Sequence, residues 1–213
     1  MDVKMYNNSF VLSPEKALFW IETKMLIISD AHLTKESHFR KNGIAVPTGI
    51  LQNDLIRISK LIQHFNPKVV LFLGDMFHSE ANEGLNEFLT WREIHSTLDI
   101  QLVVGNHDIL HRDWYQTANI KLIPDEITID NIILSHDKLS VIPDGKINFF
   151  GHLHPAIRLH GIAKQSLQLP CFYCDKQHMI LPAFGKFTGF KTITVKKNVV
   201  VFAIGDNQIF KVN

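Results

Sequence analysis

Residues 69–75 read Val-Val-Leu-Phe-Leu-Gly-Asp, an apolar run that passes directly into a glycine and a carboxylate. A continuous run of this length and character predicts a β-strand that is buried on both faces. The same arrangement recurs along the chain, with largely apolar runs at 25–28, 100–104, 132–134 and 147–150. Each of these runs also ends in polar or turn-forming residues, so the pattern predicts a buried sheet whose strand ends carry polar groups.

A helix is predicted between the runs at 25–28 and 69–73, at about residues 49–65, where apolar residues recur at intervals of three and four. Thr48 is its predicted N-cap, and Asn66-Pro67 ends it. A second helix is predicted at about residues 82–98. Because helices alternate with strands, we expect crossover connections and a partly parallel sheet.

The pattern changes after residue 126, where strand-like segments follow one another with short turns such as Lys197-Asn198 and Gly205-Asp206 between them. The predicted strands are 127–134, 167–173, 179–181, 192–195, 199–204 and 208–212. No repeat, low-complexity segment or flexible linker divides the chain. We therefore expect a single α/β domain over residues 1–213, richer in antiparallel strands in its second half.

Composition sets further bounds on the class of protein. Of the 213 residues, 46% are hydrophobic and 20% are charged, which excludes a disordered, collagenous or heptad-dominated chain. Lysine and arginine total 22 against 21 acidic residues, so charge does not favour nucleic acid as a partner. With two cysteines, no apolar leader and no membrane-spanning run, we expect a cytoplasmic protein without a disulfide framework. The 12 histidines are unusual, and they direct attention to a metal or acid–base site.

Polar residues at five strand ends form the candidate site. Sites in parallel sheets form at the carboxyl ends of strands. Because residues two apart in an extended segment point the same way, Asp30 and His32 are predicted to converge on one point, and His152 and His154 on another. The intervening glycines allow sharp turns without a side chain that would crowd the site. The five motifs are Asp30-x-His32, Gly74-Asp75, Gly105-Asn106-His107-Asp108, His136 and Gly151-His152-x-His154.

The donor set indicates metal chemistry. Carboxylate, carboxamide and imidazole groups without a thiolate suit Mn, Fe, Zn or Co rather than a structural zinc ion. The ligands are too many for one tetrahedral ion, whereas two ions that share a carboxylate would use them all. Two ions ~3.5–4 Å apart activate a water and hold the attacking and leaving oxygens of an in-line displacement, which is phosphoester chemistry. A histidine that is not a ligand could then protonate the leaving oxygen.

In order and spacing, the motifs from Asp30 to His154 resemble the signature of the calcineurin-like metallophosphoesterases. The resemblance implies a four-layer α/β/β/α sandwich with mixed sheets and a dinuclear centre for which Mn²⁺ is the expected ion. It also implies a role for each residue: Asp30, His32 and His154 hold one metal, Asn106, His136 and His152 hold the second, Asp75 bridges them, His107 protonates the leaving group, and Asp108 orients His107.

Further motifs resemble a narrower branch, the bacterial phosphodiesterases or endonucleases of the ligase-associated DNA damage response. They include Phe39-Arg40-Lys41-x-Gly43, Gly74-Asp75-x-Phe77-His78-Ser79, Leu169-Pro170-Cys171-Phe172 and Leu181-Pro182-Ala183-Phe184-Gly185. The branch implies a phosphodiester substrate, with DNA as the candidate, and a functional association with a DNA ligase and a helicase. The chain departs from the branch at Thr34-Lys35, where a Gly-Lys pair is expected.

Two other functions stay open at this stage. One is a phosphodiesterase for cyclic nucleotides or nucleotides, and the other is a non-catalytic scaffold of the same fold. Loss of the histidine that is not a metal ligand would mark a scaffold, but His107 is present.

Several residues outside the motifs have more than one interpretation. Arg40 is a candidate phosphate ligand or an ion-paired arginine, and His78 is a substrate-binding or plain loop histidine. Arg92 is expected at the surface. The Cys171-x-x-Cys174 pair is interpreted as inert thiols that face opposite sides of a strand, because no second pair and no helix N-terminus accompanies it. No basic stripe with interleaved aromatic residues is evident, so no platform for single-stranded DNA is predicted.

Overall fold

The computed structural model describes residues 1–41, 43–78, 83–161 and 165–212. A seven-stranded mixed sheet forms the first half of the fold. Its strands pair antiparallel from the first to the fourth and parallel from the fourth to the seventh, so the fourth strand has one neighbour of each kind. In spatial order the strands are β1 (Asp2–Met5), β2 (Asn8–Ser13), β3 (Ala17–Trp20), β4 (Met25–Ser29), β5 (Val69–Leu73), β6 (Asp99–Val103) and β7 (Ile120–Ile123).

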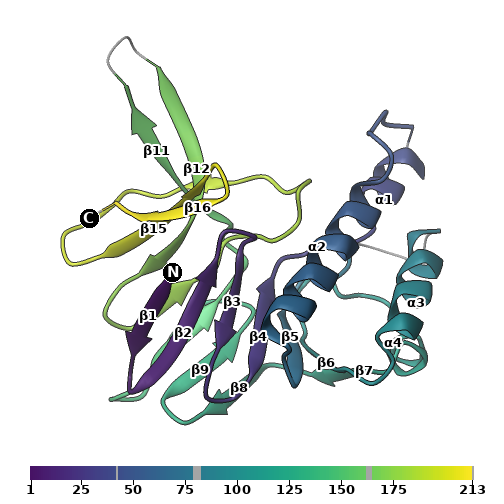
Figure 1. Ribbon diagram of the computed structural model, residues 1–213, viewed down its shortest axis with the longest axis horizontal. Coiled ribbons are helices and arrows are strands. Elements are labelled where there is room, and N and C mark those ends of the chain that lie inside the picture. Colours follow the sequence, from purple (N-terminus) through teal and green to yellow (C-terminus); the bar gives the residue numbers. More distant parts are fainter. Residues whose placement is uncertain (42, 79–82, 162–164, 213) are drawn as a thin grey trace.

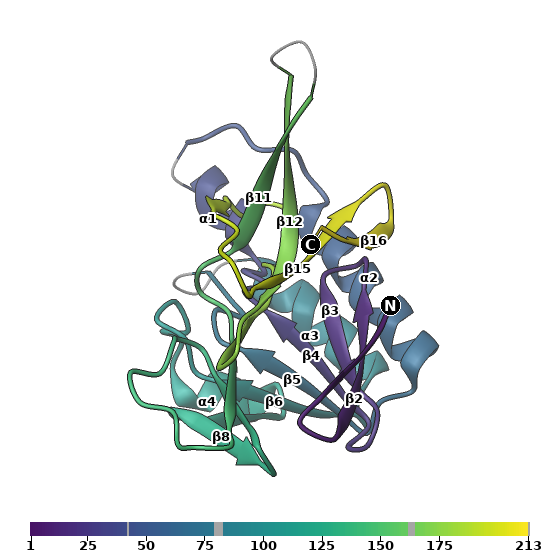
Figure 2. The same cartoon turned by 90° about the vertical axis from the view of Figure 1, so that its left-hand side faces the viewer.

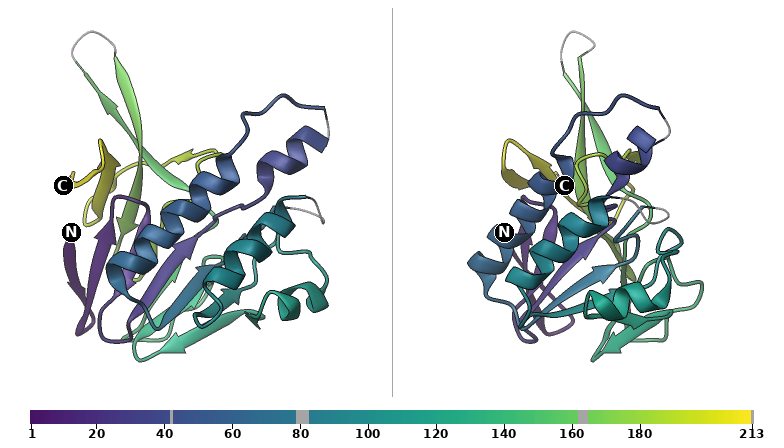
Figure 3. Two further views of the ribbon diagram at one scale, coloured as in Figure 1. Left: turned by 45° about the vertical axis from the view of Figure 1, so that its right-hand side comes forward. Right: turned by 90° about the vertical axis from the view of Figure 1, so that its right-hand side faces the viewer.

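Helices connect the parallel strands and cover one face of this sheet (Figure 3). They are α1 (Lys35–Lys41), α2 (Ile50–Phe65), α3 (Gly84–Ile94) and α4 (Arg112–Thr117). The apolar face of α2 packs on the sheet with Leu51, Leu55, Ile58 and Leu61 buried. This packing confirms the helix that the three- and four-residue spacing predicts.

The start of α2 differs from the prediction. Gly49, and not Thr48, is the N-cap, and its φ of 81° lies in the left-handed region that favours glycine. No side chain at the cap position accepts a hydrogen bond. Instead the backbone N–H of Ile50 donates to the Glu36 carboxylate of α1 at 2.7 Å, so a distant acidic residue performs the capping function.

A second mixed sheet contains nine strands. Six of them follow the order β11, β12, β13, β10, β9 and β8, with β14 beside β11, and with β15 and β16 extending from β12. Their bounds are β8 (Glu126–Ile129), β9 (Ile132–Ser135), β10 (Ile147–Phe150), β11 (Pro155–His160), β12 (Ser166–Cys174), β13 (His178–Ile180), β14 (Lys191–Thr192), β15 (Val200–Gly205) and β16 (Gln208–Lys211).

Alternate residues of the first sheet enter two different cores. Leu26 and Ile28 of β4 pack under the helices, whereas Met25 and Ile27 face the second sheet. The two sheets meet through a cluster that includes Phe149 of β10. Strands buried on both faces are therefore confirmed, as is the mixed α/β fold with two mixed sheets.

The outer face of the second sheet is covered by β structure. Every described helix ends by residue 117, and a third apolar cluster there joins Ile157 of β11, Cys171 of β12 and Val201 of β15. The β11–β12 hairpin, which belongs to the second sheet, projects beyond the other strands of the fold (Figures 1 and 2). Where the resemblance implies a fourth, helical layer, the described chain has this hairpin and the segment around Ile193.

Two strand predictions need correction. The run 127–134 is two strands, β8 and β9, which pair antiparallel across a turn at Asp130 and Asn131. The predicted strand 192–195 is reduced to β14, which pairs in parallel with β11 and not with the strand that follows it. Both errors arose because a run of apolar residues does not reveal its turn or its partner.

Arg92 was predicted at the surface and is buried, with 5% of its area exposed. Its guanidinium donates to the carbonyl oxygens of Ala118 and Leu98, each at 2.9 Å. These hydrogen bonds satisfy backbone carbonyl groups that follow α4 and α3. The free thiols Cys171 and Cys174 lie on different sides of β12, as predicted, and burial raises their pKa to about 12 and about 11. No helix of the described residues is long and apolar enough to cross a membrane.

Candidate metal centre

The predicted site residues lie at strand ends from both sheets. Asp30 directly follows β4, Asp75 lies two residues beyond β5, and His107 lies in the loop after β6. From the second sheet, His136 follows β9 and His152 lies two residues beyond β10. Because β4, β5 and β6 run in parallel, as do β9 and β10, their carboxyl ends meet in one place.

Asp30, His32 and His154 form a first group of potential metal ligands. Each offers one atom, and these atoms all lie within 4.8 Å of one another. The Nε2 atom of His154 is 3.3 Å from Oδ1 of Asp30. Asp30 is fully buried and His32 is 6% exposed, so this group is largely removed from water.

A second group contains Asp75, His136 and His152, whose potential ligand atoms also lie within 4.8 Å of one another. The Nε2 atom of His136 is 3.5 Å from Oδ1 of Asp75 and 3.1 Å from Nδ1 of His152. The Oδ1 atom of Asn106 lies 3.1 Å from the same Nε2. The carboxamide thus lies beside the second group, to which the resemblance assigns it.

Asp75 faces both groups. Its Oδ2 atom lies 3.8 Å from Nε2 of His32 in the first group, and its Oδ1 atom lies 3.5 Å from Nε2 of His136 in the second. Oδ1 also accepts a hydrogen bond from the backbone N–H of His107 at 2.9 Å. One buried carboxylate therefore presents a different oxygen to each group, which is the arrangement that a shared ligand requires.

Backbone carbonyls fix which nitrogen of two histidines can bind a cation. The Nδ1 atom of His136 lies 3.1 Å from the Leu73 carbonyl oxygen, and Nδ1 of His154 lies 3.2 Å from that of Gly189. A carbonyl oxygen only accepts, so each Nδ1 carries the proton and each Nε2 presents a lone pair to the centre. Both rings are thereby held in the form that suits a metal ligand.

A second observation supports the fit of these residues to a pair of cations. The Nε2 atom of His32 is buried and has no hydrogen-bond partner among the described residues. A buried polar atom left without a partner costs about 1–3 kcal/mol, and a cation at that point would satisfy it. Burial, with a smaller effect of the nearby Lys35 ammonium, lowers the pKa of His32 to about 2, so the lone pair stays available.

Glycines let the chain close around the ligands. A Cβ atom at Gly74, whose φ is +70°, would overlap the His136 ring. A Cβ atom at Gly151 would overlap the side chains of Ser29 and Asp30. The prediction that these glycines leave room at the site is confirmed.

Gly74→Ala is therefore expected to lower the free energy of unfolding by more than the cost of holding an alanine in the left-handed region. The His136 imidazole must also move to make room for the new Cβ atom. Gly145→Ala is the matched control, since Gly145 has a φ of +77° and a Cβ there would meet nothing within 4 Å. The control should lose about 1–2 kcal/mol. Denaturant unfolding of both variants measures the difference, and equal losses would show that the space at Gly74 is not needed.

The backbone at the ligands is not extended. Asp30, His32, His152 and His154 have φ of 50°, 44°, 57° and 46°, all in the left-handed region. Asp30 and His32 still converge, but His152 and His154 enter different groups. The convergence of His152 and His154 expected from alternation is therefore wrong, whereas the separate roles that the resemblance implies agree with the observed grouping. The alternation rule fails here because the strands have already ended.

His107 lies beside the ligands without entering either group. Its ring stacks on that of His78, with centroids 4.7 Å apart, and meets the edge of His32 at 5.4 Å. His78 lies close as well, with its Nδ1 atom 3.4 Å from Nδ1 of His32. Arg40 instead forms an ion pair with Glu36 at 3.6 Å, so the structure brings His78 to the centre and places Arg40 on α1 beside an acidic partner.

Asp108 does not hold the His107 ring. Its two carboxylate oxygens accept hydrogen bonds from the backbone N–H groups of Phe77 at 3.2 Å and Gly105 at 2.9 Å. Burial raises its pKa to about 6. No hydrogen bond joins the two side chains in the described part of the chain, so Asp108 ties the loop after β5 to the loop after β6, and the expected orienting contact is corrected.

A partly buried ionic cluster behind the first group was not predicted. The Arg57 guanidinium of α2 contacts the carboxylates of Asp54 at 2.7 Å and Glu15 at 2.6 Å, and donates to the Phe184 carbonyl at 3.1 Å. The Phe184 N–H in turn donates to the Ser29 carbonyl at 2.8 Å, next to Asp30. Local sequence gives no signal for the whole cluster, because Glu15 and Phe184 lie far along the chain from Asp54 and Arg57 of α2.

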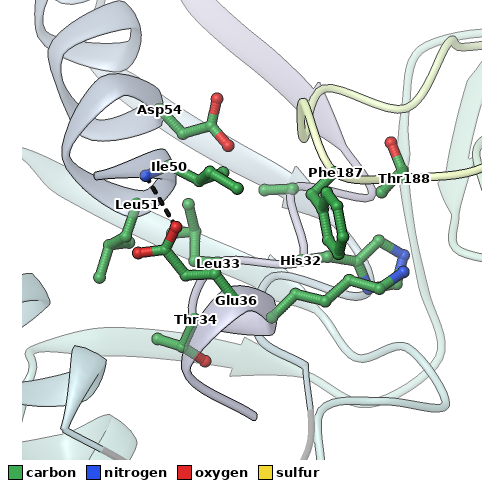
Figure 4. A pocket seen from close by; sticks show the side chains of 11 residues that line it. His32, Leu33, Thr34, Glu36, Ile50, Leu51, Asp54, Phe187 and Thr188 are labelled. Carbon is green, nitrogen blue, oxygen red and sulfur yellow. Dashed lines mark hydrogen bonds between the residues drawn. The ribbon is translucent and has the colours of Figure 1, made fainter. Parts of the chain in front are cut away.

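A small pocket opens between this cluster and the metal centre (Figure 4). His32 and Phe187 line one side, and Glu36 and Asp54 line the other. Burial raises the pKa of Asp54, and Arg57 opposes that rise. The pocket is thus walled by buried carboxylates that already have partners in α2 and α1.

Comparison with known proteins agrees with this geometry. The family model for the calcineurin-like phosphoesterases matches residues 23–170, and the chain belongs to that family. Members use a dinuclear metal site, and the chain is accordingly a metal-dependent phosphoester hydrolase with two groups of side chains suited to metal ions.

Individual solved structures are also similar. The nuclease MPE of Pseudomonas putida superposes with a TM-score of 0.84 at 26% identity, covering 99% of each chain. The phosphoesterase Yfce of E. coli has a TM-score of 0.48 at 14% identity, covering 88% of this chain and 97% of its own. No curated protein sequence matches the chain.

Proposed function

We propose that the chain hydrolyses phosphodiester bonds of DNA in a repair setting. The observation that carries the reaction class is Asp75, whose two oxygens face two separate groups of potential metal ligands. Similarity over 99% of the chain to a nuclease supports a nucleic-acid substrate. The resemblance to the ligase-associated branch supports a cytoplasmic location and a functional association with a DNA ligase and a helicase.

In this proposal Asp30, His32 and His154 hold one ion, and Asn106, His136 and His152 hold the other, with Asp75 shared between them. When bound, two such ions lower the pKa of a water molecule and stabilise negative charge on the phosphoryl oxygens. Oxygen and imidazole donors without a thiolate suit Mn²⁺ as well as Fe, Zn or Co, and we propose Mn²⁺ as the ion. The Nδ1 protons of His136 and His154, held by backbone carbonyls, keep both rings aimed at the centre.

His107 is proposed as the group that protonates the leaving oxygen. Its ring nitrogens have no hydrogen-bond partner within the described chain, and its ring lies against His78 and His32 at the mouth of the centre. The backbone N–H of His107 donates to Asp75, so the ring is placed relative to the shared carboxylate. Asp108 acts one step further away, since it fixes the loop that carries His107.

Metal dependence tests this proposal. Protein treated with a chelator should lose hydrolysis of bis-p-nitrophenyl phosphate, and added Mn²⁺ should restore it. The restored enzyme should also cleave DNA faster than cyclic nucleotides when the two are compared by kcat/KM. Turnover that persists without metal would overturn the dinuclear mechanism, and a preference for cyclic nucleotides would overturn DNA as the substrate.

A further inference from the structure

A groove on the outer side of the second sheet adjoins the metal centre. Its floor contains Phe150, Leu153 and Tyr173, and its rim carries Lys138, Lys191 and Lys196. We refer to these six residues as the lysine groove. The rim lysines come from the loop after β9, from β14 and from the segment that follows β14, so the groove depends on the fold and not on one stretch of sequence.

The lysine groove is attached directly to the candidate ligands. Leu153 of its floor lies between His152 and His154, and each of these two histidines belongs to a different ligand group. The backbone N–H of Lys191 donates to the His154 carbonyl at 3.0 Å. The lysine groove therefore shares its backbone with residues of both ligand groups.

Charge in the groove is predominantly positive. None of the three rim lysines forms an ion pair with another described residue, and all three are exposed. The acidic residue in the same groove, Asp175, already contacts His178 at 3.0 Å and accepts two backbone hydrogen bonds. Three uncompensated ammonium groups on one rim favour a ligand with several negative charges.

The floor selects among anionic ligands. Phe150 and Tyr173 are only 1% and 9% exposed, so the apolar surface that a ligand can reach beneath the cationic rim comes from the partly exposed Leu153 and the neighbouring Ile193. A nucleic-acid strand matches both features, because its phosphates require cations and its sugars and bases present flat or apolar faces. A small anion would use the rim alone and would leave the floor uncovered.

We propose that the lysine groove binds the stretch of nucleic-acid strand that flanks the scissile phosphate. This inference rests on the proposed nuclease function and adds a subsite that the metal ligands do not provide. It also accounts for binding of a polyanion by a chain whose formal net charge is only +1, since local charge and not total charge meets the strand.

The test compares a combined variant, Lys138→Gln, Lys191→Gln and Lys196→Gln, with a control that carries Lys60→Gln, Lys68→Gln and Lys121→Gln. The control removes the same charge at exposed lysines of α2, its following loop and β7, away from the groove. For each Mn²⁺-loaded protein, kcat/KM is measured on a long single-stranded oligonucleotide and on bis-p-nitrophenyl phosphate. The ratio of the two values is the readout.

The groove variant should lower this ratio by ~10-fold or more, mainly through KM for the oligonucleotide, and the control should not. For the groove variant, the slope of log KM for the oligonucleotide against log salt concentration should also fall by roughly 2, as expected for the loss of three phosphate contacts to a single strand. An unchanged ratio would overturn the groove while leaving the proposed function intact. Absence of oligonucleotide cleavage in the unaltered enzyme would instead contradict the proposed function itself.

Discussion

Asp75→Asn is expected to lower the metal content of both sites together. The carboxylate presents Oδ2 to the first ligand group at 3.8 Å and Oδ1 to the second at 3.5 Å, so its charge is shared. Loss of a supporting contact around a metal costs ~10–100-fold in affinity, and loss of a direct, shared charge should cost more. Metal content per chain after dialysis, measured by elemental analysis, should fall at both sites, and activity should fall with it.

Asp2→Asn is the control for this variant, because Asp2 is exposed on β1, the edge strand of the first sheet farthest from β4, β5 and β6 in the strand order. It should retain the metal content of the unaltered protein. If Asp75→Asn loses only one ion and keeps the other at full occupancy, the carboxylate serves one site and is not shared.

His107→Ala should separate catalysis from metal binding. The ring lies outside both ligand groups, and only its backbone N–H contacts Asp75, which the alanine variant keeps. General acid catalysis contributes ~10²–10⁴-fold, so the rate on DNA should fall by at least ~100-fold with metal content unchanged. The loss should be smaller on bis-p-nitrophenyl phosphate, whose phenolate leaves readily without a proton.

His64→Ala provides the comparison, as His64 is an exposed histidine of α2. It should match the unaltered protein on both substrates. A drop in metal content that parallels the drop in rate for His107→Ala would make His107 a ligand. Equal losses on the two substrates would show that it does not protonate the leaving group.

The ends of the buried strands were the most predictable part of this protein. The run at 69–73 matches β5 and the run at 147–150 matches β10, because strands buried on both faces must be continuously apolar. Placing the polar residues relative to those ends then brought Asp30, Asp75 and His136 to one edge. Neither step needed knowledge of the side-chain geometry.

The N-terminal strands and the capping of α2 could not be predicted in the same way. β2 and β3 pair antiparallel and carry polar residues such as Asn8, whose Oδ1 accepts a hydrogen bond from the buried Trp20 indole at 3.1 Å. The first backbone N–H of α2, that of Ile50, donates to Glu36, which lies 14 residues earlier in the chain. Both depend on tertiary contacts that local patterns do not record.

Backbone conformation at the ligands was the main source of error in the site. Extended geometry was assumed for Asp30-x-His32 and His152-x-His154, but all four residues have positive φ. Non-glycine residues in this region cost of order 1–3 kcal/mol each, and such strain concentrates where function fixes the chain. The separation of His152 and His154 into two ligand groups follows from that turn.

Aromatic and charged surfaces were also underestimated. The sequence shows no basic stripe, because Lys138 and Lys191 are 53 positions apart in the printed sequence and line one groove only in the folded chain. An overall charge near zero is therefore compatible with the local cationic groove that we propose as a binding surface. Folding, and not composition, assembles the lysine groove.

The central claim is that this chain holds two metal ions on either side of Asp75. A crystal structure of the Mn²⁺-loaded protein, with anomalous scattering measured at the manganese edge, tests it most directly. We predict two anomalous peaks ~3.5–4 Å apart, one among Asp30, His32 and His154 and the other among Asn106, His136 and His152, with Asp75 in contact with both. A single peak, or two peaks that Asp75 does not join, would contradict the claim.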